Sequence, residues 1–203
     1  NNVMKYAQEL YEGIELGSGG PVGLITYMRT DSVTIAKEAQ YACSKFIKEN
    51  YGEEYAPSKF NYYKNKAAAQ EAHEAIRPTN IARTPESIKK YLSLEEYKIY
   101  SLIYNRAIAS LMTDAVVEDT KVEVVNGKHL FVIQGEKVVF DGFLKVYEEA
   151  NLDVTEDVDL LPELLVDEKL NLNELTKEQK FTSPPHRYTE ARLIRKMEEL
   201  GIG

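Results

Sequence analysis

Two side chains near the N-terminus could act together on a phosphate group. Tyr27 and Arg29 follow the apolar pair Leu24-Ile25 within the stretch 23–32. In an extended segment, residues i and i+2 point the same way, so the phenol and the guanidinium could face one phosphate. An activated phenol oxygen is a nucleophile, and a neighbouring guanidinium stabilises the charge that develops during attack. Spacing alone leaves a second interpretation open, in which the Tyr27 ring packs in the core and Arg29 lies on the surface.

The residues after Arg29 predict a helix whose N-terminus would lie beside this pair. Asp31 or Ser32 can cap a helix over about 33–49 by accepting hydrogen bonds from its first backbone N–H groups. The remaining N–H groups and the helix dipole favour a bound anion. The sequence therefore predicts a strand-like entry, a turn and a helix start around Tyr27.

Two further clusters contain basic side chains beside prolines. His73 and Arg77 are four residues apart at the end of a helix predicted over 67–76, where they would share one face. A zinc-protease helix needs a second histidine where Arg77 stands, so that metal site is excluded. Arg187 follows Pro184-Pro185 near a predicted helix start, which suits contact with a nucleic-acid backbone. A solvated helix face and a plain helix entry are the alternatives for these clusters.

The composition is that of a protein that buries a core, with 203 residues, 43% hydrophobic and 29% charged. Cys43 is the one cysteine, which excludes an internal disulfide framework and favours an intracellular setting. It shares a register with the apolar side of its predicted helix, so we expect it to pack. No apolar run is long enough to span a bilayer.

The net charge of −8 is concentrated in the middle of the chain. Residues 1–113 hold 14 Lys and Arg against 13 Asp and Glu, residues 114–180 hold 7 against 17, and residues 181–203 hold 4 against 3. A negative total argues against a nucleic-acid binder, but this acidity belongs to the middle segment. If the chain contacts phosphate, the two ends do so.

The first part of the chain is predicted to be mainly helical. Periodicity indicates helices over 3–12, 33–49, 67–76 and 93–112, separated by a Gly-rich break over 13–21 that should hold no regular structure. Thr84 before Pro85 is typical of a helix start, and Ser93 with Glu96 has the spacing of a capping box.

The pattern changes after residue 113. Residues 120–125 and 130–133 predict a hairpin around the turn Asn126-Gly127, and short strands are expected over 138–140, 143–147 and 169–175. Thr189 is a candidate cap for a last helix. We therefore expect an α+β fold with a helical domain over 1–113, an antiparallel β unit over 114–180 and the start of a further helical domain over 181–203.

Three stretches resemble the signatures of the bacterial type IA DNA topoisomerases. They are LITYMRTDS over 24–32, EAHEAIRPT over 71–79, and PPHRYTE over 184–190 with its continuation to Gly203. The likeness covers essentially the whole chain, and Met28 favours the topoisomerase I branch. It implies the central region of that fold, in which a helical domain carries the active-site tyrosine, a partial β arch follows and a short helical DNA-binding segment comes last.

The resemblance also implies roles for individual residues. Tyr27 would attack a DNA phosphodiester and form a 5′-phosphotyrosine link with a free 3′-hydroxyl. Arg29 would stabilise the phosphate, and His73 would assist by hydrogen bonding near it. Three supporting or DNA-contacting residues would be Asp31, Arg77 and Arg187.

For the complete enzyme, the family implies an isomerase that cleaves and rejoins one strand without ATP and relaxes negative supercoils. Mg²⁺ and a general acid would come from a Toprim domain outside this chain, so no metal is expected within it. The partners would be single-stranded or negatively supercoiled DNA and the other domains of the same polypeptide, in the bacterial cytoplasm at the nucleoid. We expect the chain to be a fragment that is inactive alone; a non-catalytic single-stranded DNA-binding module is the alternative.

Overall fold

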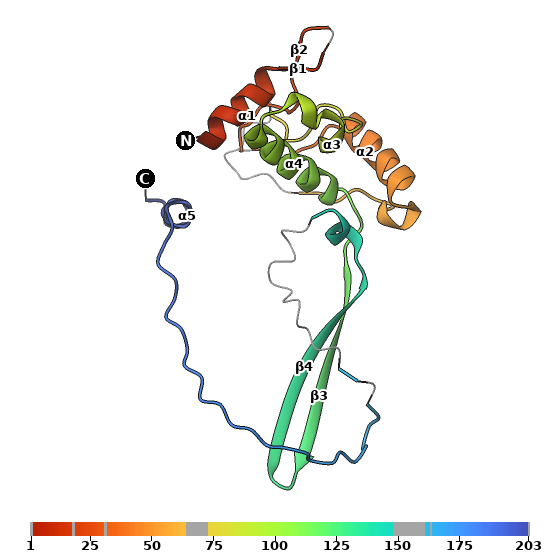
Figure 1. Cartoon of the computed structure of the whole chain (residues 1–203), viewed down its shortest axis with the longest axis vertical. Coiled ribbons are helices and arrows are strands. Elements are labelled where there is room, and N and C mark those ends of the chain that lie inside the picture. The colour runs from red at the N-terminus through yellow and green to blue at the C-terminus, as the bar shows by residue number, and fades with distance from the viewer. Residues whose placement is uncertain are drawn as a thin grey trace. The chain divides into compact units, whose positions relative to one another are not determined.

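The computed structural model describes residues 2–17, 19–30, 32–63, 73–147, 161–162 and 164–202. The chain divides into two compact units, Asn1–Pro162 and Glu163–Gly203. The main helices of the first unit are α1 (Asn2–Glu12), α2 (Lys37–Asn50), α3 (Pro85–Ile88) and α4 (Leu94–Ala109). Its long hairpin pairs β3 (Val116–Asn126) with β4 (His129–Phe140), and the second unit contains α5 (Glu190–Leu200) (Figure 1). The expected α+β class is confirmed, whereas the domain boundaries at 113 and 180 stay predictions.

The core of the helical part forms around α4. Tyr100 and Ile108 of this helix are fully buried, as are Leu10 of α1 and Ile47 of α2. The Tyr100 hydroxyl donates to the Arg83 carbonyl at 2.7 Å, so this buried polar group is satisfied. Burial raises the pKa of Tyr100 to about 12.

Cys43 packs in this core, as expected from its register. It is 3% exposed, and burial raises the pKa of its thiol to about 12. A thiol that stays protonated is a poor nucleophile, so Cys43 contributes packing and no chemistry.

Helix starts with strong local signals are confirmed. Thr84 caps α3 and accepts a hydrogen bond from Ser87 N. Ser93 and Glu96 form the complete capping box of α4. Thr189 caps α5 by accepting from Arg192 N. These caps need only neighbouring residues, which is why the sequence predicts them.

Two predicted helices differ from the structure, one at its start and one at its described end. Helix α2 begins at Lys37 and not near 33; its N-cap is Ala36, which provides no side-chain bond. The Ser32 hydroxyl accepts from Thr34 N at 3.2 Å in a local turn, and Asp31 lies outside the described residues. Residues 73–76 are not helical, so the helix predicted over 67–76 fails at its described end, and 67–72 lie outside the description. The expected helix N-terminus beside Tyr27 is therefore absent.

The Gly-rich break over 13–21 is more ordered than predicted. Strands β1 (Ile14–Glu15) and β2 (Pro21–Val22) pair antiparallel on its two sides, with Ile14 opposite Val22. Among the described residues of this break, Gly13, Leu16, Gly17, Gly19 and Gly20 lie outside helices and strands. The pair brings the end of α1 back towards residue 23.

The β unit is a single long hairpin among the described residues of 114–180. Antiparallel pairing is confirmed, but its two-residue loop is Gly127 and Lys128, since Asn126 still pairs with His129. The strands predicted over 143–147 and 169–175 are wrong. Residues Gly142–Lys145 form a 3₁₀ turn, and 169–175 hold no regular structure.

The base of the hairpin is fixed to the helical part through Tyr55. Its hydroxyl donates to Asp141 Oδ1 at 2.7 Å, and its ring lies 5.0 Å from that of Phe140. Lys145 Nζ lies 3.4 Å from Asp141 Oδ2. The bond from Tyr55 is the main reason why the pKa of Asp141 lies below its ordinary value. The rest of the hairpin is exposed along most of both strands and extends away from the helices of the first unit (Figure 1).

Candidate active site

The first two sequence clusters lie side by side in the structure. Thr26 N donates to the Arg77 carbonyl at 2.9 Å, and Thr79 N donates to the Leu24 carbonyl at 3.0 Å. Ile25 and Pro78 form an isolated antiparallel bridge between these bonds. Segment 24–26 is thus paired with segment 77–79, although about fifty residues of chain separate them. This pairing replaces the helix that the sequence predicted around His73.

The Thr26 side chain holds the two segments together a second time. Its hydroxyl donates to the Ala75 carbonyl at 2.7 Å and accepts from Arg77 N at 3.0 Å. A further bond joins Ala75 N to the Thr34 carbonyl at 2.7 Å. Residues on both sides of Tyr27 therefore contact the segment that follows His73, and this fixes the two motifs relative to each other.

Tyr27 lies at the surface of this pairing. Its side chain is 45% exposed, whereas its neighbour Met28 is 7% exposed and Arg29 is again exposed. The alternation matches the expectation that Tyr27 and Arg29 share a side of an extended segment. The alternative of a core tyrosine is wrong. The phenol is accessible to a substrate, with a guanidinium two residues away.

Two aromatic side chains contact the Tyr27 ring. The His73 ring centroid lies 5.7 Å away with an angle of 37° between the ring planes. The Tyr11 ring, at the end of α1, lies 5.3 Å away with an angle of 58°. Both distances fall in the range of favourable aromatic pairs. The structure thus brings Tyr27 and His73 together by tertiary pairing.

The Arg77 guanidinium is held within the protein. Its Nη2 lies 2.6 Å from Glu74 Oε2, its Nη1 donates to the Pro78 carbonyl at 3.0 Å, and its side chain is 17% exposed. This partly buried ion pair orients the loop that follows His73. Arg77 therefore has a structural role in this loop. A contact between Arg77 and DNA stays a prediction.

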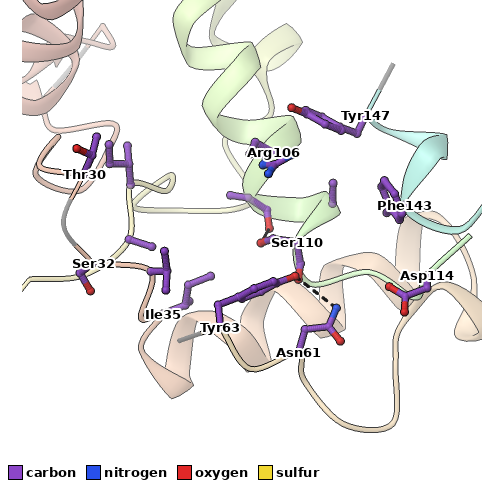
Figure 2. A pocket seen from close by; sticks show the side chains of 15 residues that line it. Thr30, Ser32, Ile35, Asn61, Tyr63, Arg106, Ser110, Asp114, Phe143 and Tyr147 are labelled. Carbon is purple, nitrogen blue, oxygen red and sulfur yellow. Dashed lines mark hydrogen bonds between the residues drawn. The ribbon is translucent and has the colours of Figure 1, made fainter. Parts of the chain in front are cut away.

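A cavity of about 450 Å³ is lined in part by residues of the two motifs (Figure 2). Thr30 and Ser32 line it on one side, and Ala75 and Ile76 belong to its wall. Arg106 of α4 lines it too, with its guanidinium 4.8 Å from the Tyr147 ring. Tyr27, Arg29 and His73 are absent from its lining, so the cavity is separate from the chemistry expected at the phenol.

Comparison with known proteins identifies the family. A family model described as DNA topoisomerase matches residues 1–203. The chain belongs to the bacterial type IA DNA topoisomerases. DNA topoisomerase 1 of Campylobacter jejuni is 47% identical over 201 residues, which are 98% of this chain and 28% of that protein. DNA topoisomerase 1 of Xylella fastidiosa is 46% identical over 206 residues, 98% of this chain and 25% of that protein.

A solved topoisomerase structure has a similar fold. Full-length topoisomerase I from Thermotoga maritima matches with a TM-score of 0.68 and 34% identity, covering 98% of this chain and 31% of that one. The chain thus spans about a quarter to a third of the length of these relatives. The resemblance to the topoisomerase I branch is confirmed.

Asp31 and Arg187 are two further site residues that the topoisomerase motifs predict. Asp31 lies outside the described residues. Arg187 is exposed in the second unit, ahead of α5. Their DNA-contacting roles, like the catalytic roles of Tyr27, Arg29 and His73, stay predictions.

The described residues offer no group of three or more His, Cys, Asp or Glu that could hold a metal ion. The acidic pair Asp157 and Asp159 lies outside the described residues. Within the same described part of the topoisomerase chain, no helix is long and apolar enough to cross a membrane.

Sequence reasoning missed three residues that build the site, namely Tyr11, Thr26 and Glu74. Tyr11 has only the pattern of a helix residue, and its contact with Tyr27 depends on the return of the chain through β1 and β2. Thr26 and Glu74 lie inside the topoisomerase motifs, but their bonds require the pairing of 24–26 with 77–79. No local signal marks these three roles.

Proposed function

We propose that this chain is the part of a type IA topoisomerase that carries the nucleophile, and that the complete enzyme cleaves and rejoins one DNA strand. The observation that carries the proposal is the exposed Tyr27 phenol, held against two rings on a segment paired with the second motif. The phenol oxygen attacks the phosphorus, a Tyr27 O–P bond forms and the P–O3′ bond breaks. The phenol proton leaves, and the departing 3′-oxygen takes up a proton.

The products explain why no ATP is required. The DNA is joined to Tyr27 through its 5′-phosphate, so one phosphodiester is exchanged for another of similar energy. The free 3′-hydroxyl then attacks the phosphotyrosine and restores the strand. Between the two steps another strand passes, and negative supercoils relax.

Arg29 and His73 assist at the same phosphate. The Arg29 guanidinium stabilises charge on the non-bridging oxygens, and removing one preorganised donor of this kind costs typically ~10²–10³ in rate. His73 lies beside the Tyr27 ring and hydrogen-bonds near the scissile phosphate. Asp31, Arg77 and Arg187 are proposed to support or contact the DNA strand.

The other components are proposed to come from the rest of the polypeptide. A Toprim domain outside this chain supplies Mg²⁺ and the general acid, so the chain alone forms no covalent adduct. One observation supports this: the chain spans only about a quarter of the length of its relatives. The substrate is single-stranded or negatively supercoiled DNA in the bacterial cytoplasm, at the nucleoid.

Covalent trapping tests this proposal. The complete enzyme is incubated with an end-labelled single-stranded oligonucleotide and Mg²⁺, and the products are separated on a denaturing gel. We expect a covalent adduct that is lost in Tyr27→Phe and kept in Tyr41→Phe, a matched change at another exposed tyrosine. An adduct in Tyr27→Phe would refute Tyr27 as the nucleophile.

The same gel tests the division of the site. We expect no adduct from residues 1–203 alone, and an adduct once the remaining domains are supplied in trans. An adduct from this segment alone would show that the other domains are dispensable for cleavage. Binding of the oligonucleotide without an adduct under all conditions would favour the non-catalytic DNA-binding module.

A further inference from the structure

Tyr11 lies outside both active-site motifs and, among the described residues, contacts the Tyr27 ring. It lies in the last turn of α1, sixteen residues before Tyr27, and the two ring centroids are 5.3 Å apart. Neither ring is buried in the core, since Tyr11 is 39% exposed and Tyr27 is 45% exposed. The contact is therefore a surface pair beside the proposed nucleophile, and not part of the packing that stabilises the fold.

The backbone holds α1 in a fixed position relative to the Tyr27 segment. Leu24 N donates to the Leu10 carbonyl at 2.7 Å. Gly23 lies against the Tyr11 carbonyl so closely that an added Cβ would be 2.7 Å from that oxygen. Leu10 is fully buried, which anchors the helix in the core. The Tyr11 ring therefore belongs to a helix whose position relative to the Tyr27 segment is fixed.

We propose that Tyr11 is a positioning residue for strand cleavage, whose ring restricts the Tyr27 side chain and holds the phenol oxygen in the orientation for attack. This inference rests on the proposed function of Tyr27. A half-exposed tyrosine can occupy several staggered rotamers, and only some of them aim the oxygen at the phosphorus. A ring that packs against one rotamer raises its population, so a larger fraction of bound complexes is ready to react.

Single-turnover cleavage by the complete enzyme tests the proposal. Tyr11→Ala is expected to lower the cleavage rate constant at saturating oligonucleotide by about 3- to 10-fold, the scale of one aromatic pair, with the oligonucleotide Kd unchanged. Tyr11→Phe keeps the ring and is expected to keep the rate. Tyr41→Ala is the matched control, because Tyr41 is 65% exposed and loses a comparable ring contact with Phe60 at 5.5 Å.

A spectroscopic readout tests the contact without relying on activity. In enzyme with ¹³C-labelled tyrosines, the Tyr27 ring signals, assigned by their loss in Tyr27→Phe, are expected to shift in Tyr11→Ala and to stay near their wild-type positions in Tyr11→Phe. The Tyr41→Ala control should leave them in place. Unshifted Tyr27 signals in Tyr11→Ala would overturn the ring contact itself.

Three kinetic results would overturn the positioning role: an unchanged saturating rate in Tyr11→Ala, a weaker Kd with an unchanged saturating rate, or an equal loss in Tyr11→Phe. The second would make Tyr11 a DNA contact, and the third would assign the effect to its hydroxyl. Failure of the proposed function looks different. In that case the wild-type enzyme forms no adduct, or the adduct survives in Tyr27→Phe.

Discussion

Thr26→Val removes the hydroxyl that joins the two active-site motifs and leaves the shape of the side chain nearly unchanged. In the wild type this hydroxyl donates to the Ala75 carbonyl and accepts from Arg77 N, at 2.7 and 3.0 Å. The backbone bond from Thr26 N to the Arg77 carbonyl stays in place. The variant therefore isolates the side-chain contribution to the pairing.

The size of the effect follows from the burial of these groups. A neutral hydrogen bond contributes about 0.5–1.5 kcal/mol net, and a buried group left without a partner costs about 1–3 kcal/mol. Thr26 is partly buried, so water can replace some of the loss. We expect Thr26→Val to weaken the local pairing by about 2 kcal/mol, and Thr26→Ser, which keeps the hydroxyl, to weaken it by much less.

Native-state hydrogen exchange measures this local stability. The Arg77 amide is expected to lose protection by roughly 30-fold in Thr26→Val, which corresponds to about 2 kcal/mol, while Tyr104 and its neighbours in α4 keep theirs. The rate of adduct formation should fall in the same variant, because the segment that follows His73 is released. Unchanged protection of the Arg77 amide, or an equal loss in Thr26→Ser, would refute this account of the site.

Two further predictions concern ionisable groups away from Tyr27. Tyr55→Phe removes the hydrogen bond that chiefly lowers the pKa of Asp141, so this pKa should rise in a carboxyl NMR titration. The ionised Asp141 stabilises the folded state at pH values above its ordinary pKa. In the variant, this stabilisation should be lost at a higher pH when the solution is acidified. Burial raises the pKa of Tyr100 from 10 to about 12. The stabilisation of the folded state by its neutral form is therefore complete below pH 10 and is lost as the pH rises towards 12, which lowers the free energy of unfolding by roughly 3 kcal/mol. In Tyr100→Phe, the free energy of unfolding should fall less steeply between pH 10 and pH 12 than in the wild type. An equally steep fall in the variant would contradict this.

The fold was predictable wherever neighbouring residues decide the structure. The caps at Thr84, Ser93 and Thr189 bond to backbone groups three residues away, so their sequence patterns are sufficient. The antiparallel pairing around residue 127 has a similar local cause, because a glycine at a φ of +61° fits a tight hairpin loop.

The errors arise where tertiary contacts override local preference. The residues after His73 follow a stretch of helix formers, yet they pair with the segment before Tyr27 and are not helical. Ser32 is a good N-cap residue, but its hydroxyl closes a local turn, and α2 starts four residues later than expected. Propensity is a weak prior against such pairing.

In the candidate site too, local signals were predictable from the sequence and tertiary contacts were not. The types and order of Tyr27, Arg29 and His73 indicate the family, because the motifs are long and specific. The proximity of Tyr27 and His73 is set by the bridge between Ile25 and Pro78, and spacing along the chain contains no information about it. The Tyr11 contact requires a helix end to return beside residue 23, which no short motif encodes.

The hairpin base at Tyr55 has a mechanical consequence. A strand of eleven residues rising about 3.3 Å per residue forms an arm about 35 Å long. A rotation of about 10° at the base would move the tip by about 6 Å on such an arm. The hydrogen bond between Tyr55 and Asp141 lies at the base of this arm. A small rotation there would therefore become a large displacement of the loop at Gly127.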